Sequence, residues 1–224
     1  MWRRGKILRG MGLSILCVGL LCSTLCSCSI FQSTCPPPAV KMVQPPPLPL
    51  PAPKENVPYA TVDFNVPLSH ITSPVIYVYK AKHRLLLIEG KTLVREYPCA
   101  LGPHPKGTKY FHGDGRTPEG KFAICKKNPY SSYHKSLGLS YPSIREAHDA
   151  LSRGLISPAQ YRAIKDADTS QRMPPSDTAL GGMVFIHGGG CKPDWTLGCI
   201  AVDNADIDEL FHVVQIGTPV YIMP

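Results

Sequence analysis

The sequence lacks three patterns that would indicate a zinc site, a nucleic-acid-binding surface or a repeat fold. No Cys-x-x-Cys pair with zinc spacing follows residue 28, so a zinc site has little support. No stripe of basic and aromatic residues of the kind that nucleic-acid binders need is present, and no internal repeat is evident. The first ten residues hold four basic and no acidic side chains, so without them the net charge of +8 falls to +4 (8 − 4). So mild a positive balance specifies no partner.

The chain of 224 residues is long enough for one sizeable domain with appendages, of which the first is a predicted export signal at residues 1–27. A basic start precedes an apolar run at residues 11–25, which is too short and wrongly flanked for a good membrane span. Residues 25–28, Leu-Cys-Ser-Cys, resemble a bacterial lipobox, which implies cleavage before Cys28 and diacylation of its sulfur. An uncleaved N-terminal anchor is the alternative.

The residues after the predicted lipid site indicate location and reach. Ser29, rather than an acidic residue, follows Cys28, which in similar lipoproteins favours the periplasmic face of the outer membrane over the inner membrane. Residues 36–58 are rich in proline and favour a semi-rigid polyproline II spacer, with a disordered linker as the alternative. We therefore predict a lipid-anchored linker at residues 28–67 and a folded domain at residues 68–224.

Short apolar segments predict that the folded domain is mainly β. Expected strands lie at residues 75–79, 84–88, 92–97, 120–124, 183–186, 199–202 and 219–222, with a glycine hairpin signal at residues 89–91. Expected helices lie at residues 144–153, 158–166 and 205–215, supported by a Ser-Pro start, helical spacing of apolar residues and a terminal glycine. The sequence thus predicts a mainly β domain with a helical insertion at about residues 144–166 and a helix near the C-terminus.

The stretch from residue 184 to residue 202 carries the most chemistry. An apolar strand brings His187 to its end, where three glycines allow backbone conformations closed to other residues. A second strand begins with Cys199, so imidazole and thiol can come within hydrogen-bond reach. The pairing matters because the thiolate is the nucleophile, and a free thiol with a pKa of about 8.5 is largely protonated at neutral pH. Two unrelated residues are one alternative, and a metal cluster that adds Cys191 but lacks a clear fourth ligand is another.

The cysteines leave disulfide pairing open. If Cys199 stays a free thiol, Cys35, Cys99, Cys125 and Cys191 remain, an even number in an export compartment that permits disulfides. Cys99 and Cys125 lie on two apolar, strand-like segments and could pair. Unpaired buried thiols that behave as small hydrophobic side chains are the alternative.

Three motifs resemble the L,D-transpeptidase catalytic domain, also called the YkuD domain. They are the His-Gly-Gly-Gly and Thr-Leu-Gly-Cys-Ile segments within residues 187–200, Gly-Asp-x-Arg-Thr-Pro-Glu-Gly-x-Phe-x-Ile at residues 113–124, and Gly-Thr-Pro-Val-Tyr-Ile at residues 217–222. The resemblance covers roughly residues 75–224. It implies a β-sandwich of the L,D-transpeptidase type whose cysteine attacks a carbonyl of a peptidoglycan stem peptide.

The resemblance also implies a role for each matching residue. Cys199 is the nucleophile and His187 its general base, with the backbone carbonyl of Gly188 orienting the imidazole. Gly198 and Cys199 supply N–H groups to the oxyanion, and Thr196 hydrogen-bonds near the site. No metal or organic cofactor is required. The implied partners are stem peptides, with membrane contact through the N-terminal lipid, and the oligomeric state stays open.

The sequence departs from the usual motif at two positions. Leu197 stands where the family commonly has His, and Ala201 stands where it commonly has Arg. Without that arginine fork, a substrate carboxylate must be held elsewhere. Candidates for substrate contacts are Arg116, Lys106, Lys109, Trp195, Tyr133 and His134, for which packing or simple exposure is the alternative.

Three functions are compatible with the resemblance. The usual reaction passes the acyl group of a tetrapeptide stem from cysteine to an amine. The Asp-Trp-Thr-x-Gly-Cys-Ile-Ala-Val form at residues 194–202 looks closer to a divergent branch that includes hydrolases of links between peptidoglycan and an anchored lipoprotein, so water is an alternative acceptor. A non-catalytic wall-binding lipoprotein is the third, since fold does not establish activity. Retention of both Cys199 and His187 argues against it.

Overall fold

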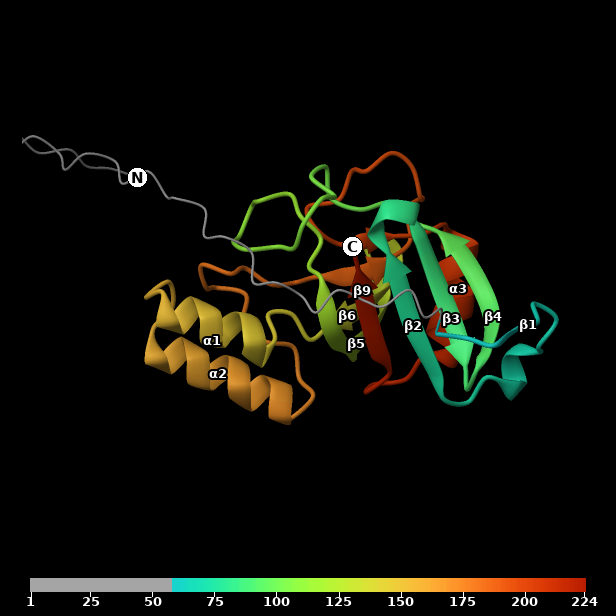
Figure 1. The fold of residues 1–224 in the computed structure, drawn as a ribbon, viewed down its shortest axis with the longest axis horizontal. Coiled ribbons are helices and arrows are strands. Elements are labelled where there is room, and N and C mark those ends of the chain that lie inside the picture. Colours follow the sequence, from blue (N-terminus) through green and yellow to red (C-terminus); the bar gives the residue numbers. More distant parts are fainter. Residues whose placement is uncertain (1–57) are drawn as a thin grey trace, which may run out of the picture. The chain divides into compact units, whose positions relative to one another are not determined.

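The computed structural model describes residues 58–224, and Figure 1 shows how the strands and helices of this part are arranged. The predicted export signal, the lipid site Cys28, Cys35 and most of the proline-rich linker lie outside the described residues. The strands are β1 (Thr61–Val62), β2 (Pro74–Tyr79), β3 (Arg84–Glu89), β4 (Thr92–Pro98), β5 (Gly120–Ser131), β6 (His134–Leu139), β7 (Phe185–His187), β8 (Ile200–Ala201) and β9 (Pro219–Met223). The helices are α1 (Ile144–Ser152), α2 (Pro158–Thr169) and α3 (Asn204–Val213), with single 3₁₀ turns at Leu68–His70 and Lys80–Lys82.

The strands are hydrogen-bonded in the order β1-β4-β3-β2-β9-β5-β6-β7-β8. Strands β2, β3 and β4 form an antiparallel meander, and β9 returns beside β2 in parallel. The long strand β5 joins two halves of the sheet, because residues 120–123 pair with β9 and residues from 124 onward pair with β6. The prediction of a mainly β fold is confirmed.

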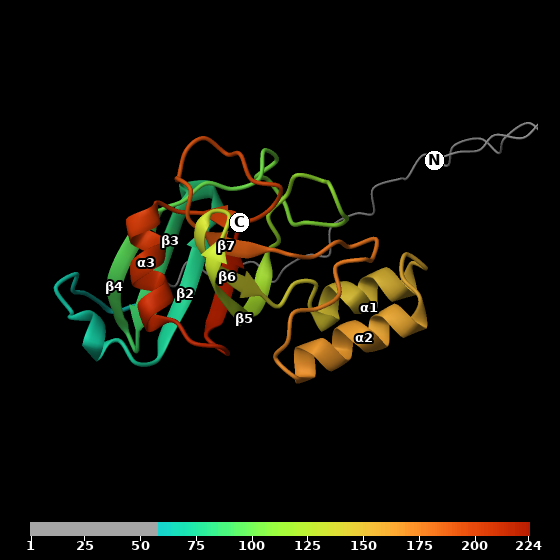
Figure 2. The same ribbon diagram turned by 180° about the vertical axis from the view of Figure 1, so that it is seen from behind.

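One apolar core is enclosed between the sheet and α3. Ile207, Leu210 and Val213, at helical spacing, are buried in the same cluster as side chains of β2, β3 and β7. Figure 2 shows α3 from behind, lying across the meander strands. Ile200 of β8 and the following Val202 are buried in the same cluster, and full burial of such a side chain contributes about 1.5–3 kcal/mol, so the core anchors β8.

The helical insertion expected near residues 144–166 is present as the pair α1 and α2, which lie side by side next to β5 and β6 (Figures 1 and 2). Each helix begins with a capping box, Ser143 with Glu146 and Ser157 with Gln160. Side chains of both helices form a separate apolar cluster that includes Ile164. The insertion therefore has its own packing and leaves the main core to the strands and α3.

Residues 58–67, in the segment assigned to the linker, include β1, which pairs in parallel with β4. The ring of Tyr59 packs against an outer cluster of the sheet together with Tyr77 and Tyr79. Among residues 58–224, no helix is both long and apolar enough to cross a membrane.

The disulfide considered between Cys99 and Cys125 is not formed. All four cysteines in the described range are free thiols. Burial raises the pKa of Cys99 to about 12 and that of Cys125 to about 11. The Cys125 thiol contacts the Met173 sulfur (3.1 Å) and the Gly138 carbonyl oxygen (3.4 Å). Cys99 is thus a buried thiol and Cys125 a partly buried one, each with its own surroundings.

Candidate active site

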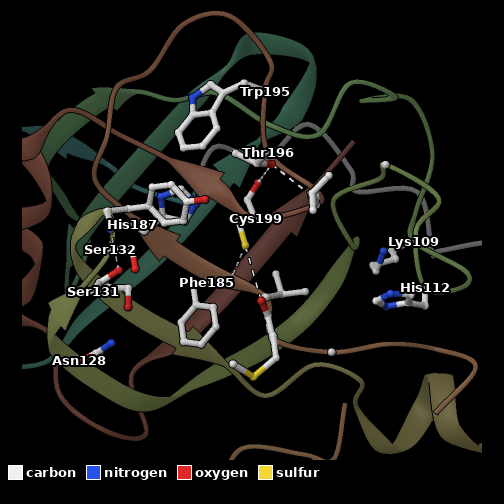
Figure 3. A pocket seen from close by; sticks show the side chains of 18 of the residues that line it. Lys109, His112, Asn128, Ser131, Ser132, Phe185, His187, Trp195, Thr196 and Cys199 are labelled. Carbon is white, nitrogen blue, oxygen red and sulfur yellow. Dashed lines mark hydrogen bonds between the residues drawn. The ribbon is translucent and has the colours of Figure 1, made fainter. Parts of the chain in front are cut away.

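A cavity of about 580 Å³ opens beside Cys199 (Figure 3). Four separate segments line it: residues 109–115 before β5, the β5–β6 turn at residues 128–136, residues 182–187 leading into β7, and residues 195–199 before β8. The parallel pairing of β7 with β8 sets Ile186 opposite Ile200. His187 follows the first of these residues and Cys199 precedes the second, so the two side chains share one face of the sheet. The structure therefore brings both predicted catalytic residues to one cavity.

The thiol of Cys199 is half-buried and points away from the imidazole toward the start of β7 (Figure 3). It accepts a hydrogen bond from the N–H of Phe185 (3.4 Å) and donates to the carbonyl oxygen of Met183 (3.6 Å). Burial raises the pKa of Cys199, and the Phe185 N–H and the charge of Lys109 oppose the rise. The thiol is therefore protonated at neutral pH, and attack requires a base and rotation of the side chain.

The imidazole of His187 is arranged as that base. Its Nδ1 lies 2.7 Å from the carbonyl oxygen of Gly188, and because a carbonyl can only accept, Nδ1 carries the proton. The other nitrogen, Nε2, is then the acceptor. The residue is 3% exposed, and its ring stacks on Tyr133 (4.6 Å between centroids) and contacts the edge of Trp195 (5.4 Å). Burial lowers the pKa of His187 and the bond to Gly188 opposes this, so the ring is neutral at pH 7.

A tight turn before β8 holds the nucleophile. The Thr196 hydroxyl donates to the carbonyl oxygen of Cys199 (2.8 Å) and accepts from the N–H of Gly198 (3.2 Å). Gly198 has φ +125°, and a Cβ there would lie 2.5 Å from the carbonyl oxygen of Arg116, so the turn requires glycine. Because the Gly198 N–H already has an acceptor, a developing oxyanion must displace that bond or use the N–H of Cys199.

The other predicted contact residues fall into two groups. Tyr133, Trp195 and Lys109 line the cavity. Arg116 does not, because its guanidinium donates to the carbonyl oxygen of Lys106 and lies over the ring of Tyr110. The remaining candidate side chains also lie elsewhere: Lys106 is exposed and His134 pairs with Asp208 at 2.8 Å.

The side chains of residues 58–224 are not arranged as the metal cluster of His187, Cys191 and Cys199 would require. Across residues 58–224, no group of three or more His, Cys, Asp or Glu side chains is arranged to hold a metal ion. The Cys191 thiol instead faces the carboxylate of Asp203 at 3.6 Å.

Sequence reasoning missed the polar end of the cavity at the β5–β6 turn. Asn128, Ser131 and Ser132 lie there below the imidazole (Figure 3). These residues lie at the end of β5 and in the turn that follows it, and no local pattern placed that turn beside the cavity. The backbone groups of Met183 and Phe185 that hold the thiol were missed for the same reason.

The lowered pKa of His187 and the raised pKa of Cys199 predict different pH profiles for turnover and for alkylation of the thiol. Since only neutral His187 can accept the thiol proton, we expect kcat/KM for a peptide donor to rise with pH through an apparent pKa below 6.5, the ordinary histidine value. Since the Cys199 pKa is raised, alkylation of the free protein by iodoacetamide should increase through an apparent pKa above 9.0. Both profiles can be measured between pH 5 and pH 10. A flat alkylation profile from pH 5 to pH 8 would reveal a preformed thiolate and contradict this arrangement.

Comparisons with known proteins agree with this architecture. The family model described as the L,D-transpeptidase catalytic domain, YkuD, matches residues 73–222. No curated protein matches the chain.

Solved structures with a similar arrangement include three L,D-transpeptidase or cell-shape proteins. An L,D-transpeptidase from Xylanimonas cellulosilytica is 19% identical with a TM-score of 0.40 over 67% of this chain and 60% of that one. The helical cell shape determining protein Pgp2 from Campylobacter jejuni is 21% identical with a TM-score of 0.46 over 67% and 46%. L,D-transpeptidase 1 from Mycobacterium tuberculosis is 13% identical with a TM-score of 0.40 over 68% and 62%. This chain spans less than two thirds of each.

Proposed function

The chain belongs to the YkuD family of L,D-transpeptidase catalytic domains, and we propose that it is a cysteine acyltransferase acting on peptidoglycan stem peptides. The observation that carries the proposal is the placement of His187 and Cys199 in one cavity, with Nδ1 of the imidazole tied to Gly188 and Nε2 left as acceptor. A wall-binding module has no need for a neutral buried imidazole that shares a cavity with a thiol.

The reaction proceeds in two steps. Nε2 of His187 takes the proton of the Cys199 thiol as sulfur attacks the carbonyl of the third residue of a tetrapeptide stem. The C–N bond then breaks, the leaving D-alanine amine receives the proton from the imidazolium, and a thioester remains. An amine of a second stem attacks the thioester, its proton passes to the imidazole, and the new amide leaves as the thiol is restored.

The protein is also proposed to be exported and anchored by a diacylated Cys28 to the periplasmic face of the outer membrane. The basic and apolar start, the Leu-Cys-Ser-Cys segment and Ser29 support this location. Incorporation of a labelled fatty acid at Cys28, and its absence in Cys28→Ala, is the measurement that tests it.

Product analysis tests the proposed reaction. The protein is incubated with disaccharide tetrapeptides, and both the intact protein and the products are weighed by mass spectrometry. We expect an acyl adduct on Cys199 with loss of D-alanine, followed by cross-linked dimers. Stems shortened by one residue without dimers would assign water as the acceptor. No adduct and no change in the stems would remove the enzymatic function.

A further inference from the structure

The cavity extends beyond Cys199 on the side away from His187, where Lys109 and His112 lie next to each other (Figure 3). Among the lysines and arginines of residues 58–224, Lys109 is the one that lines this cavity. Its side chain is 4% exposed, although lysine is among the residues least often buried. The mechanism proposed above gives this buried charge no task.

The surroundings of Lys109 aim its charge at the cavity. The ammonium donates to Oδ1 of Asp114 (2.7 Å) and to the carbonyl oxygen of Phe111 (3.2 Å). Within the described residues these two acceptors serve three ammonium protons, so one proton is available to a ligand in the cavity. The Asp114 carboxylate also accepts from the N–H groups of Tyr110, Phe111 and Arg116. Lys109 lines the cavity and Asp114 does not, so the positive end of the ion pair is the end nearer the cavity.

The position of the ammonium relative to the nucleophile limits what it can bind. A Cβ built on Gly198 would lie 3.7 Å from Nζ of Lys109, so the ammonium lies next to the residue that precedes the nucleophile. An anion bound by Lys109 therefore lies in the same cavity as the nucleophile and close to the residue that precedes it, so the short leaving group of the proposed reaction is the part of the donor that we place there.

We propose that Lys109 is the anion-binding residue of the cavity and that it receives the free α-carboxylate of a leaving group one amino acid long. The inference rests on the proposed function and adds a specificity to it. Donors that end one residue after the attacked carbonyl place their carboxylate against the ammonium, whereas longer or amidated donors leave its third proton without an anionic acceptor. A charge-assisted hydrogen bond of this kind is short and directional.

The charge can be tested without turnover by alkylating Cys199 with two reagents of similar size, anionic iodoacetate and neutral iodoacetamide. The rates are followed at Cys199 by peptide mass spectrometry in a Cys191→Ala background, because Cys191 is also accessible. We expect Lys109→Met to lower the ratio of iodoacetate to iodoacetamide rates by about tenfold. The matched control Lys106→Met removes an exposed lysine of the same loop and should change the ratio less than about twofold.

A second variant covers the case in which Lys109→Met does not fold, since that change leaves Asp114 buried without its counter-ion. Lys109→Met/Asp114→Asn removes both charges and should lower the rate ratio equally. An unchanged ratio in the folded variants overturns the inference, whether or not the protein acts on peptidoglycan. If the ratio falls while the unmodified protein fails to act on stems, the anion site stands and the proposed function fails.

The carboxylate itself is tested with two tetrapeptide donors, one ending in a free carboxylate and one in a carboxamide. The unmodified protein should prefer the carboxylate donor in kcat/KM by about 10²-fold, and Lys109→Met should lose most of that preference. Equal use of both donors by the unmodified protein would overturn the assignment of the ligand as the terminal carboxylate.

Discussion

Cys199→Ala is expected to lower peptidoglycan acyl transfer by at least about 10⁴-fold, because the variant has no group that can form the thioester. Alanine is smaller than cysteine, and the thiol makes only two weak hydrogen bonds, to backbone groups of Met183 and Phe185. The fold should therefore persist, and the loss of activity can be assigned to chemistry. The measurement is the rate of dimer formation together with the mass of the intact protein after incubation with tetrapeptide stems.

Cys191→Ala is the matched control for this variant. Cys191 lies in the same loop between β7 and β8, and its thiol faces the Asp203 carboxylate instead of the cavity. We expect its activity to stay within about twofold of the unmodified protein, since neither group touches the cavity. Dimer formation that survives Cys199→Ala, or that is lost in Cys191→Ala, would assign the nucleophile to another residue.

The catalytic stretch could be predicted from sequence because its signals are local. The apolar residues before His187, the three glycines and the Gly-Cys pair define two strand ends joined by one loop, and the structure shows β7 and β8 paired there. The helix after Cys199 was also predicted, at residues 205–215. It ends at Val213 instead, because Val214 adopts an extended conformation.

The length of β5 could not be predicted in the same way. Residues 120–124 carry the alternating apolar pattern, whereas the strand continues to Ser131 because β6 pairs with its polar second half. That extension carries the turn with Tyr133 over the imidazole. The two strands form a hairpin, but the second half of β5 is polar and carries no apolar alternation that would indicate a strand.

The sequence also could not predict which charged side chains are buried. Lys109 and Arg116 look alike as basic residues of a glycine-rich loop, and sequence favours the arginine because its fork suits a carboxylate. In the structure the arginine turns toward Lys106, while Lys109 is buried beside Asp114. Which of two nearby charges is enclosed depends on how residues 102–119 cross the end of the sheet, and that path is a tertiary property.

The path of this loop depends on another buried lysine, Lys80. Among the substitutions considered, replacing Lys80 should lower the free energy of unfolding the most. Lys80, in the 3₁₀ turn after β2, is 2% exposed and donates to Oε1 of Glu119 (2.7 Å) and to the carbonyl oxygens of Thr117 (2.9 Å) and Gly107 (2.6 Å). One ammonium thus joins both ends of the loop that carries Lys109. Burial lowers the pKa of Lys80 and the Glu119 carboxylate opposes this, as expected for a desolvated ion pair.

Lys80→Met is expected to lower the free energy of unfolding by about 3–5 kcal/mol, because methionine fills the space but leaves the buried Glu119 carboxylate and two carbonyl oxygens without a donor. Urea denaturation measures the change. The matched control Lys82→Met alters an exposed lysine of the same turn, which lies over the ring of Tyr79 at 5.4 Å, and should cost less than about 1 kcal/mol. Adding Glu119→Gln to Lys80→Met should recover part of the loss, since the pair is then removed together. If Lys80→Met and Lys82→Met unfold at the same urea concentration, the buried pair does not hold the loop.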